Sequence, residues 1–210
     1  MDCRAERRRS PLAPLAAGVV AVMAGNVATG RILTAHDGGR VDALAAAAVA
    51  GRGTPARDRI GLAASWLTDV PRAVVITAGV VAATAVVSRD ARRAALPGVA
   101  TALASAMHVT VSLLVRRPRP AGERIGTEQL TTSYPSGHVG AATAQSLVLA
   151  GMASALPAWP RRAVRVGCAV APLLVGWSRL YTGQHHTSDV LAGCVNGVVA
   201  AGVARRALGR

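Results

Sequence analysis

Long apolar runs alternate with short polar segments along most of the chain. A helix of roughly 20 apolar residues is needed to cross the hydrocarbon core of a bilayer. Six runs approach this length, and we predict a membrane-spanning helix in each of them. Their approximate bounds are 12–29, 72–88, 96–115, 135–156, 163–177 and 188–203. The pattern therefore predicts an all-α integral membrane protein, a six-transmembrane-helix bundle with residues 1–210 in a single domain.

The first run follows a cluster of Arg residues at positions 4 and 7–9, an arrangement that also begins signal peptides. No small-residue cleavage site follows the run, because Gly30 and Arg31 intervene, so we predict an uncleaved span.

The connection between the first two spans, residues 31–71, is long. Its Ala-rich part, residues 41–50, is too short to cross a membrane, and we predict an interfacial or re-entrant helix there. Trp66 suits the boundary between membrane and water. Further along, Pro97 is predicted to mark the entry of the third span.

The charge pattern also favours a membrane protein. The formal net charge is +14, and all 24 basic residues are Arg. They cluster at the ends of the apolar runs, as they do in proteins whose loop charges set their orientation. Phe is absent, so the chain lacks the interleaved aromatic side chains on which nucleic-acid bases stack, and we predict no nucleic-acid partner. The short Arg-rich segments place both termini in the cytoplasm, and the loops with polar motifs then face the outside of the plasma membrane.

The segment 178–189 is the most polar junction between two apolar runs. Ionisable residues beside hydrocarbon are costly and call for a functional explanation. Arg179 can clamp phosphoryl oxygens, the neutral imidazole of His185 can attack phosphorus, and Asp189 can orient that imidazole. Alone, the segment also fits an ordinary polar loop.

A second motif, Pro135-Ser136-Gly137-His138, stands at the start of the fourth predicted span. A helix N-terminus offers free N–H groups and the positive end of the helix dipole, which together suit a phosphate. Gly137 permits close approach of the backbone, Ser136 can donate a hydrogen bond, and His138 can reach a leaving oxygen. The same residues also fit an ordinary helix start.

A third motif follows the third predicted span, where Arg117 and Arg119 alternate with prolines. Proline restricts the backbone, so the two guanidinium groups can be held over the membrane surface to grip phosphate oxygens. A cluster of Arg residues that simply stops the span is the alternative.

Taken in order, the three motifs resemble those of the phosphatidic acid phosphatase type 2 superfamily of lipid phosphatases, whose soluble relatives include vanadium haloperoxidases. The resemblance covers about residues 96–203. It implies an active site at one membrane surface, with His185 as the nucleophile that forms a phosphohistidine, Asp189 as its orienting carboxylate and His138 as the general acid. The implied phosphate-binding residues are Arg119, Arg179, Ser136, Gly137 and, as a further candidate, Arg117.

The resemblance implies no metal and no cofactor, because guanidinium groups neutralise the phosphate. The chain departs from the family pattern at Ser112, where the family has a Lys seven residues before the Arg of its Arg-Pro pair. We hypothesise that Arg116 supplies the missing charge, one helical turn further on. His108, inside the third span, is interpreted as a packed interior residue, and His186 as a residue at the rim of the site.

These features predict a bacterial enzyme that hydrolyses a membrane lipid phosphate or diphosphate. An outward-facing site favours a polyprenyl diphosphate of the undecaprenyl or decaprenyl type, used in envelope synthesis. Phosphatidylglycerophosphate and phosphatidate are alternative substrates. A catalytically silent lipid-phosphate-binding protein and a transporter are alternative functions. The sequence does not indicate the oligomeric state.

Overall fold

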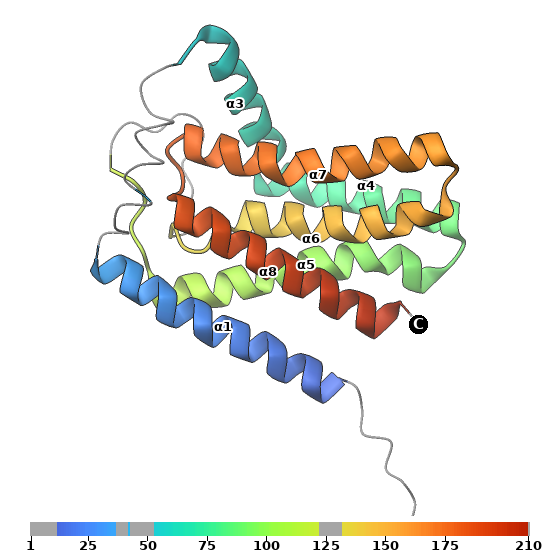
Figure 1. The fold of residues 1–210 in the computed structure, drawn as a ribbon, viewed down its shortest axis with the longest axis horizontal. Coiled ribbons are helices and arrows are strands. Elements are labelled where there is room, and N and C mark those ends of the chain that lie inside the picture. The colour runs from blue at the N-terminus through green and yellow to red at the C-terminus, as the bar shows by residue number, and fades with distance from the viewer. Residues whose placement is uncertain (1–11, 37–41, 43–52, 122–131, 210) are drawn as a thin grey trace, which may run out of the picture.

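The computed structural model describes residues 12–36, 42, 53–121 and 132–209. Within these residues the chain is helical and contains no strand. Figure 1 shows a bundle of roughly parallel and antiparallel helices with one helix, α3, projecting from it. The helices are α1 (Leu12–Ala35), α3 (Pro55–Leu67), α4 (Val70–Ser88), α5 (Ala91–Val115), α6 (Gly137–Met152), α7 (Ala158–Tyr181) and α8 (Thr187–Leu208).

Five of the described helices are long and apolar enough to cross a membrane, namely α1, α4, α5, α7 and α8. The chain is thus a multi-pass membrane protein, as predicted, but a count of six spans is not confirmed. The fourth predicted span corresponds to α6, which has only 16 residues and a length of about 24 Å, less than the roughly 30 Å of a hydrocarbon core. It ends in a 3₁₀ turn at Ala153–Ala155. Helices α5, α7 and α8 pack around it, so α6 lies inside the bundle.

Helix α5 corrects the predicted entry of the third span. It begins at Ala91, and Pro97 lies inside it rather than at its start. The side chain of Asp90 accepts hydrogen bonds from the backbone N–H groups of Arg92 and Arg93, at 2.8 and 3.2 Å. A carboxylate in this position satisfies donors that have no partner within the helix. This cap determines where the helix begins.

Small residues let α8 approach α6 closely. A Cβ atom on Gly193 would lie 2.4 Å from the carbonyl oxygen of Ser136, and one on Gly197 would lie 2.6 Å from that of Gly140. Close backbone approach at small residues spaced by four is a common way for helices to associate in membranes. The N-terminal ends of α6 and α8 are brought together by this packing, and both ends carry predicted site residues.

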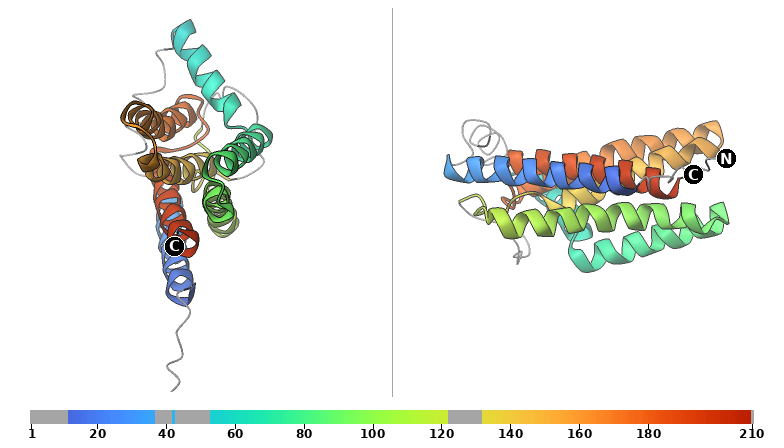
Figure 2. Two further views of the ribbon diagram at one scale, coloured as in Figure 1. Left: turned by 90° about the vertical axis from the view of Figure 1, so that its right-hand side faces the viewer. Right: turned by 90° about the horizontal axis from the view of Figure 1, so that it is seen from below.

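Helix α3 projects from the bundle in Figure 1 and in the left view of Figure 2, and it contacts α7. Thr54 caps its start, with Pro55 in the first turn. Trp66 is 54% exposed, and the guanidinium of Arg72 lies 3.8 Å above its ring. These side chains suit a membrane–water boundary. The helix predicted at 41–50 lies outside the described residues, apart from Asp42.

Candidate active site

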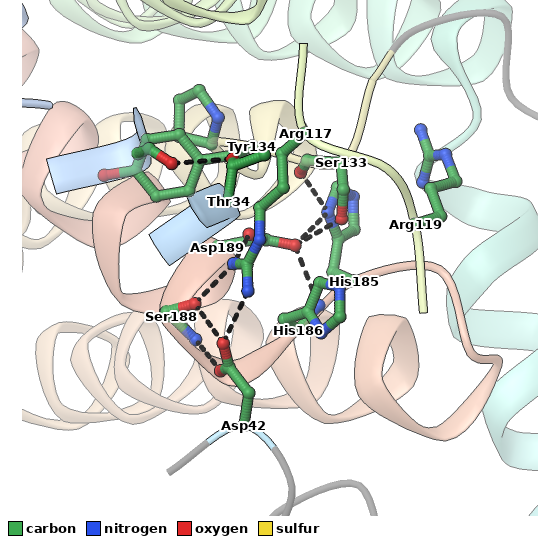
Figure 3. A network of polar contacts seen from close by, with 12 residues as sticks. Thr34, Asp42, Arg117, Arg119, Ser133, Tyr134, His185, His186, Ser188 and Asp189 are labelled. Atoms are coloured by element: carbon green, nitrogen blue, oxygen red, sulfur yellow. Dashed lines mark hydrogen bonds and ion pairs between the residues drawn. The ribbon is translucent and has the colours of Figure 1, made fainter. Parts of the chain in front are cut away.

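The three polar motifs are joined by backbone hydrogen bonds, and Figure 3 shows Arg117 from one motif close to His185 and Asp189 from another. The backbone N–H of Ser133 donates to the carbonyl of Arg117 at 2.9 Å, and the N–H of Ser136 donates to the carbonyl of Asp189 at 2.9 Å. Because these bonds join all three motifs, the segments that precede α6 and α8 are held against the Arg-Pro segment. The sequence expectation that the motifs share one face is thus met in their geometry.

His185 lies on the turn between α7 and α8 and is buried. Its Nδ1 lies 2.7 Å from the carbonyl oxygen of Ser133. A carbonyl only accepts hydrogen bonds, so Nδ1 carries the proton and Nε2 keeps its lone pair. Burial lowers the pKa of His185 below its ordinary value, and the nearby carboxylate of Asp189 opposes this only in part. At neutral pH the ring is neutral and Nε2 carries a lone pair, as a nucleophile requires.

Asp189 is fully buried at the start of α8. Its Oδ2 accepts hydrogen bonds from the hydroxyl of Ser133 and from the backbone N–H of His186, the latter at 2.8 Å. The distance from Asp189 Oδ2 to His185 Nδ1 is 3.7 Å. The nearer partner of the imidazole is therefore the Ser133 carbonyl, a residue that the sequence analysis did not single out. The carboxylate of Asp189 thus positions Ser133 by a hydrogen bond to its hydroxyl, and the carbonyl of Ser133 positions the ring of His185.

Arg117 is 2% exposed and lies between two carboxylates. One terminal nitrogen donates to Asp189 Oδ1 at 2.7 Å and to the hydroxyl of Ser188 at 2.7 Å, and the other donates to Asp42 Oδ2 at 2.8 Å. These contacts favour a role in holding the site together rather than the phosphate-binding role predicted from sequence. Asp42 belongs to no motif and was also missed.

Arg179, near the end of α7, is 1% exposed. Its terminal nitrogens donate to the hydroxyl and carbonyl oxygens of Ser65 at 3.2 and 3.3 Å and to the hydroxyl of Thr68 at 2.7 Å. Asp69 lies 3.9 Å away. Helix α3 and the turn after it thus hold this guanidinium in place, a role for α3 that no pattern in the sequence indicated.

Three predicted site residues carry a buried polar atom without a hydrogen-bond partner among the described residues: Ser136 Oγ, His138 Nε2 and Arg179 Nε. Such atoms are rare in folded proteins, and each calls for an explanation. Arg179, Arg119 and the titratable His185 all act electrostatically on His138, and Ser136 lies two residues before it, so the three atoms belong to one neighbourhood. An oxygen-rich ligand, such as a phosphoryl group, would supply the missing partners.

Arg119 and Gly137 complete the set of predicted phosphate-binding residues. The half-buried Arg119 donates to the backbone carbonyl of Gln184 at 2.6 Å, directly before His185 in the chain. Gly137 is the first residue of α6, and a Cβ atom there would lie 2.7 Å from the ring of His108. Only a glycine fits this contact. His108 itself bonds to the carbonyl of Pro135 at 2.7 Å, which agrees with its interpretation as a packed interior residue.

The position of the missing Lys carries no charge. The hydroxyl of Ser112 donates to the carbonyl of Val109 at 2.9 Å, within its own helix. Arg116 is exposed, and its Nε donates to the carbonyl of Leu113 at 3.2 Å. The contacts of Arg116 thus lie at the end of α5, and they lend no support to the hypothesis that it replaces the Lys. Half-buried His186 caps α8, beside the nucleophile.

Comparison with known proteins agrees with this geometry. The chain matches the PAP2 superfamily over residues 93–210. Its fold is similar to the crystal structure of the first transmembrane PAP2 type phosphatidylglycerolphosphate phosphatase from Bacillus subtilis. The TM-score is 0.72 at 20% sequence identity, and the match covers 92% of this chain and 94% of the other. Comparison with the curated proteins gives no significant match.

The family match spans more than half of the chain and contains the three motifs. The resemblance inferred from those motifs is therefore confirmed: the chain belongs to the PAP2 superfamily.

Proposed function

We propose that the protein hydrolyses a membrane lipid phosphate or diphosphate through a phosphohistidine at His185. One observation carries the proposal: a buried imidazole, protonated on Nδ1 and not on Nε2, lies in the same neighbourhood as three buried polar atoms that have no partner among the described residues. Membership of a superfamily of phosphatases supports the same reaction class.

In the first step, Nε2 of His185 attacks phosphorus, and the bond from phosphorus to the leaving oxygen breaks. His138 enters this step as the imidazolium and donates a proton to that oxygen, so the lipid alcohol, or a lipid monophosphate if the substrate is a diphosphate, departs as a neutral or less charged group. Burial and the nearby Arg179 lower the pKa of His138 to about 2, and the negative charge of the substrate phosphate opposes this shift. In the second step, water attacks the phosphohistidine while His138 takes up a proton. Inorganic phosphate leaves, and His185 returns to its neutral form.

Charge on the transferred phosphoryl group would be balanced by Arg119 and Arg179. The hydroxyl of Ser136 and the backbone N–H of Gly137, at the N-terminus of α6, would donate to its oxygens. Donors that are already in place need no reorganisation during the reaction, which is the largest single source of catalysis in many enzymes. These guanidinium groups supply the neutralising charge in our mechanism, which contains no step at a metal ion.

For the substrate, we favour a polyprenyl diphosphate at the outer surface of the plasma membrane. The predicted orientation, with cytoplasmic termini and an outward-facing site, supports this choice. A phosphatidylglycerophosphate substrate has its own support, because the solved structure with the similar fold is named as a phosphatidylglycerolphosphate phosphatase. Phosphatidate is a further alternative.

The proposal is tested by phosphate release from detergent-solubilised protein in the presence of EDTA. A polyprenyl diphosphate, phosphatidate and phosphatidylglycerophosphate would be compared as substrates. Wild-type protein is expected to release phosphate, and His185→Ala is expected to release none. The control is His36→Ala, since His36 is exposed at the end of α1. No release from any substrate by wild-type protein that still binds the lipids would instead identify a silent lipid-phosphate-binding protein.

A further inference from the structure

Asp42 is a buried carboxylate that the proposed reaction does not use. Its Oδ1 accepts the backbone N–H of Ser188 at 2.8 Å, and its Oδ2 accepts the hydroxyl of Ser188 at 2.7 Å. Oδ2 also accepts a terminal N–H of Arg117 at 2.8 Å. Figure 3 shows Asp42 on the side of Arg117 and Ser188 that is turned away from His185. The carboxylate thus makes three strong contacts without reaching the nucleophile.

One of these contacts caps a helix. Ser188 is the second residue of α8, and its backbone N–H is among the donors that lack a partner inside the helix. A negative charge is favourable at this end of the helix dipole. Asp42 therefore supplies, from 146 residues earlier in the chain, a cap for the helix that carries Asp189.

A second contact neutralises Arg117. The guanidinium is shared between Asp42 at 2.8 Å and Asp189 at 2.7 Å, and all three side chains are nearly inaccessible to solvent. Removal of one member of a buried ion pair leaves a charge without compensation, which is costly. The carboxylate of Asp42 therefore both positions the guanidinium of Arg117 and compensates its charge.

The contacts continue from Arg117 to the nucleophile without a break. Arg117 binds Asp189 Oδ1, and Asp189 Oδ2 accepts the hydroxyl of Ser133. The carbonyl of the same Ser133 accepts Nδ1–H of His185 at 2.7 Å. Each step is a hydrogen bond between buried groups, so a displacement at Asp42 is passed on to the ring.

We propose that Asp42 is a positioning residue for phosphohistidine formation, acting through Arg117 and Asp189 on the orientation of His185. This inference rests on the phosphatase function proposed above. In the part of the chain that the structure describes, the hydrogen bonds of Asp42 are to Arg117 and Ser188 and to none of the residues that bind phosphate in the proposed mechanism. Its effect should therefore be on the chemical step and not on substrate binding.

The test is Asp42→Asn, which keeps the shape of the side chain and removes its charge. We expect kcat to fall about ten- to a hundred-fold, as small misplacements of a reacting group do, with KM unchanged within about twofold. The matched control is Asp90→Asn, the same substitution in an exposed cap at the start of α5, where Asn caps equally well. Equal kcat values for the two variants would overturn the inference.

A pH profile separates positioning from mere loss of folded protein. Without the charge of Asp42, Arg117 is less compensated beside Asp189, so protonation of His185 becomes less favourable. The acid limb of kcat/KM is then expected to move to lower pH in Asp42→Asn. The other charged or titratable groups facing His185 are Arg119, Arg179, His108 and His138. These are unchanged in the variant, and fewer folded molecules alone would leave the limb where it is.

A double-mutant cycle tests whether Asp42 acts on His185 through Arg117. In an Arg117→Met background, Asp42→Asn should cause no further loss of kcat, whereas additive losses would show that Asp42 does not act through Arg117. If Asp42→Asn yields no folded protein, Ser188→Ala removes only the bridging hydroxyl and should lower kcat in the same direction; no change would contradict the inference. If the wild-type protein releases no phosphate, the phosphatase assignment itself is overturned. If the wild type is active and Asp42→Asn is equally active, only the role of Asp42 is overturned.

Discussion

The two halves of the candidate active site differ in how their polar groups are satisfied. On the nucleophile side, His185 Nδ1, both oxygens of Asp189 and both terminal nitrogens of Arg117 have partners within the protein. On the phosphate side, Ser136 Oγ, His138 Nε2 and Arg179 Nε are buried without a partner among the described residues.

This difference has a physical reason. A nucleophile must be held in one orientation and tautomer before the substrate arrives, so its partners come from the protein. Groups that bind a transferred phosphoryl group must keep their hydrogen-bonding capacity for it, at a cost in the empty site of about 1–3 kcal/mol for each unsatisfied group. The predictions below test this division of roles.

The largest effect is expected at Asp189. Asp189→Asn removes the charge that pairs with Arg117 and replaces an acceptor of the Ser133 hydroxyl by an amide group. We expect kcat to fall about a thousandfold or more, comparable to the loss of the carboxylate that orients the histidine in Ser–His–Asp enzymes. Phosphate release measured on monodisperse protein checks this. A loss smaller than tenfold would show that the carboxylate does not orient the nucleophile.

A pair of serine variants compares the two halves directly. Ser136→Ala removes a hydroxyl that has no partner among the described residues, so kcat/KM should fall about ten- to a hundred-fold while thermal stability stays unchanged. Ser133→Ala removes the hydroxyl that donates a hydrogen bond to Asp189. This variant should lower activity and, in addition, lower the free energy of unfolding by about 1–3 kcal/mol. Thermal unfolding in detergent and phosphate release are measured on both. Equal stability losses would refute the division into two halves.

A stability effect is expected where α6 and α8 touch. Gly193→Ala would place a Cβ atom 2.4 Å from the Ser136 carbonyl, and such overpacking costs about 1–3 kcal/mol. The control is Gly202→Ala on the same helix, where nothing lies within 4 Å. Its midpoint of thermal unfolding should be unchanged or higher, because Ala favours helix over Gly by about 1 kcal/mol. Similar midpoints for both variants would argue against close packing of the two helix ends.

The smallest expected effect is a shift in pH dependence. Burial lowers the pKa of His185, so the neutral nucleophile persists as pH falls below its ordinary value of about 6.5. The acid limb of kcat/KM should therefore lie below pH 6.5. The lowered pKa also affects stability. The folded state binds a proton at His185 less readily than the unfolded state does, so the free energy of unfolding decreases as pH falls below about 6.5. An acid limb above pH 6.5 would contradict a buried, neutral nucleophile.

Much of the candidate site could be predicted from the sequence because its residues stand in short motifs. The segments around Ser136 and His185 are read directly from residue type and spacing, and they meet at one end of the bundle as expected. Ser133 could have been noticed, since it lies three residues before Ser136. However, Ser133 binds His185 through its backbone carbonyl. Every residue has a backbone carbonyl, so the residue type does not reveal this role.

The fold was predicted well where apolar length alone decides it and less well at helix ends. The start of α5 at Ala91 depends on the cap by Asp90, whereas the sequence analysis relied on Pro97. Helix α6 reads as a span because it is apolar, but its neighbours on three sides are other helices. Hydropathy does not distinguish a helix buried in protein from a helix surrounded by lipid, since both environments are apolar.

By itself, the sequence determined that the chain is a helical membrane protein with the three motifs of a phosphatase superfamily. These properties are local: apolar run length, charge at run ends and residue spacing within a dozen positions. Tertiary structure alone decided that Asp42 and Arg117 pair, that α3 holds Arg179, and that Ser133 orients His185. The partners in these contacts are 52 residues apart for Ser133 and His185, 75 for Asp42 and Arg117, and 114 for Ser65 and Arg179. No local pattern encodes such pairs, because helix packing brings their side chains together.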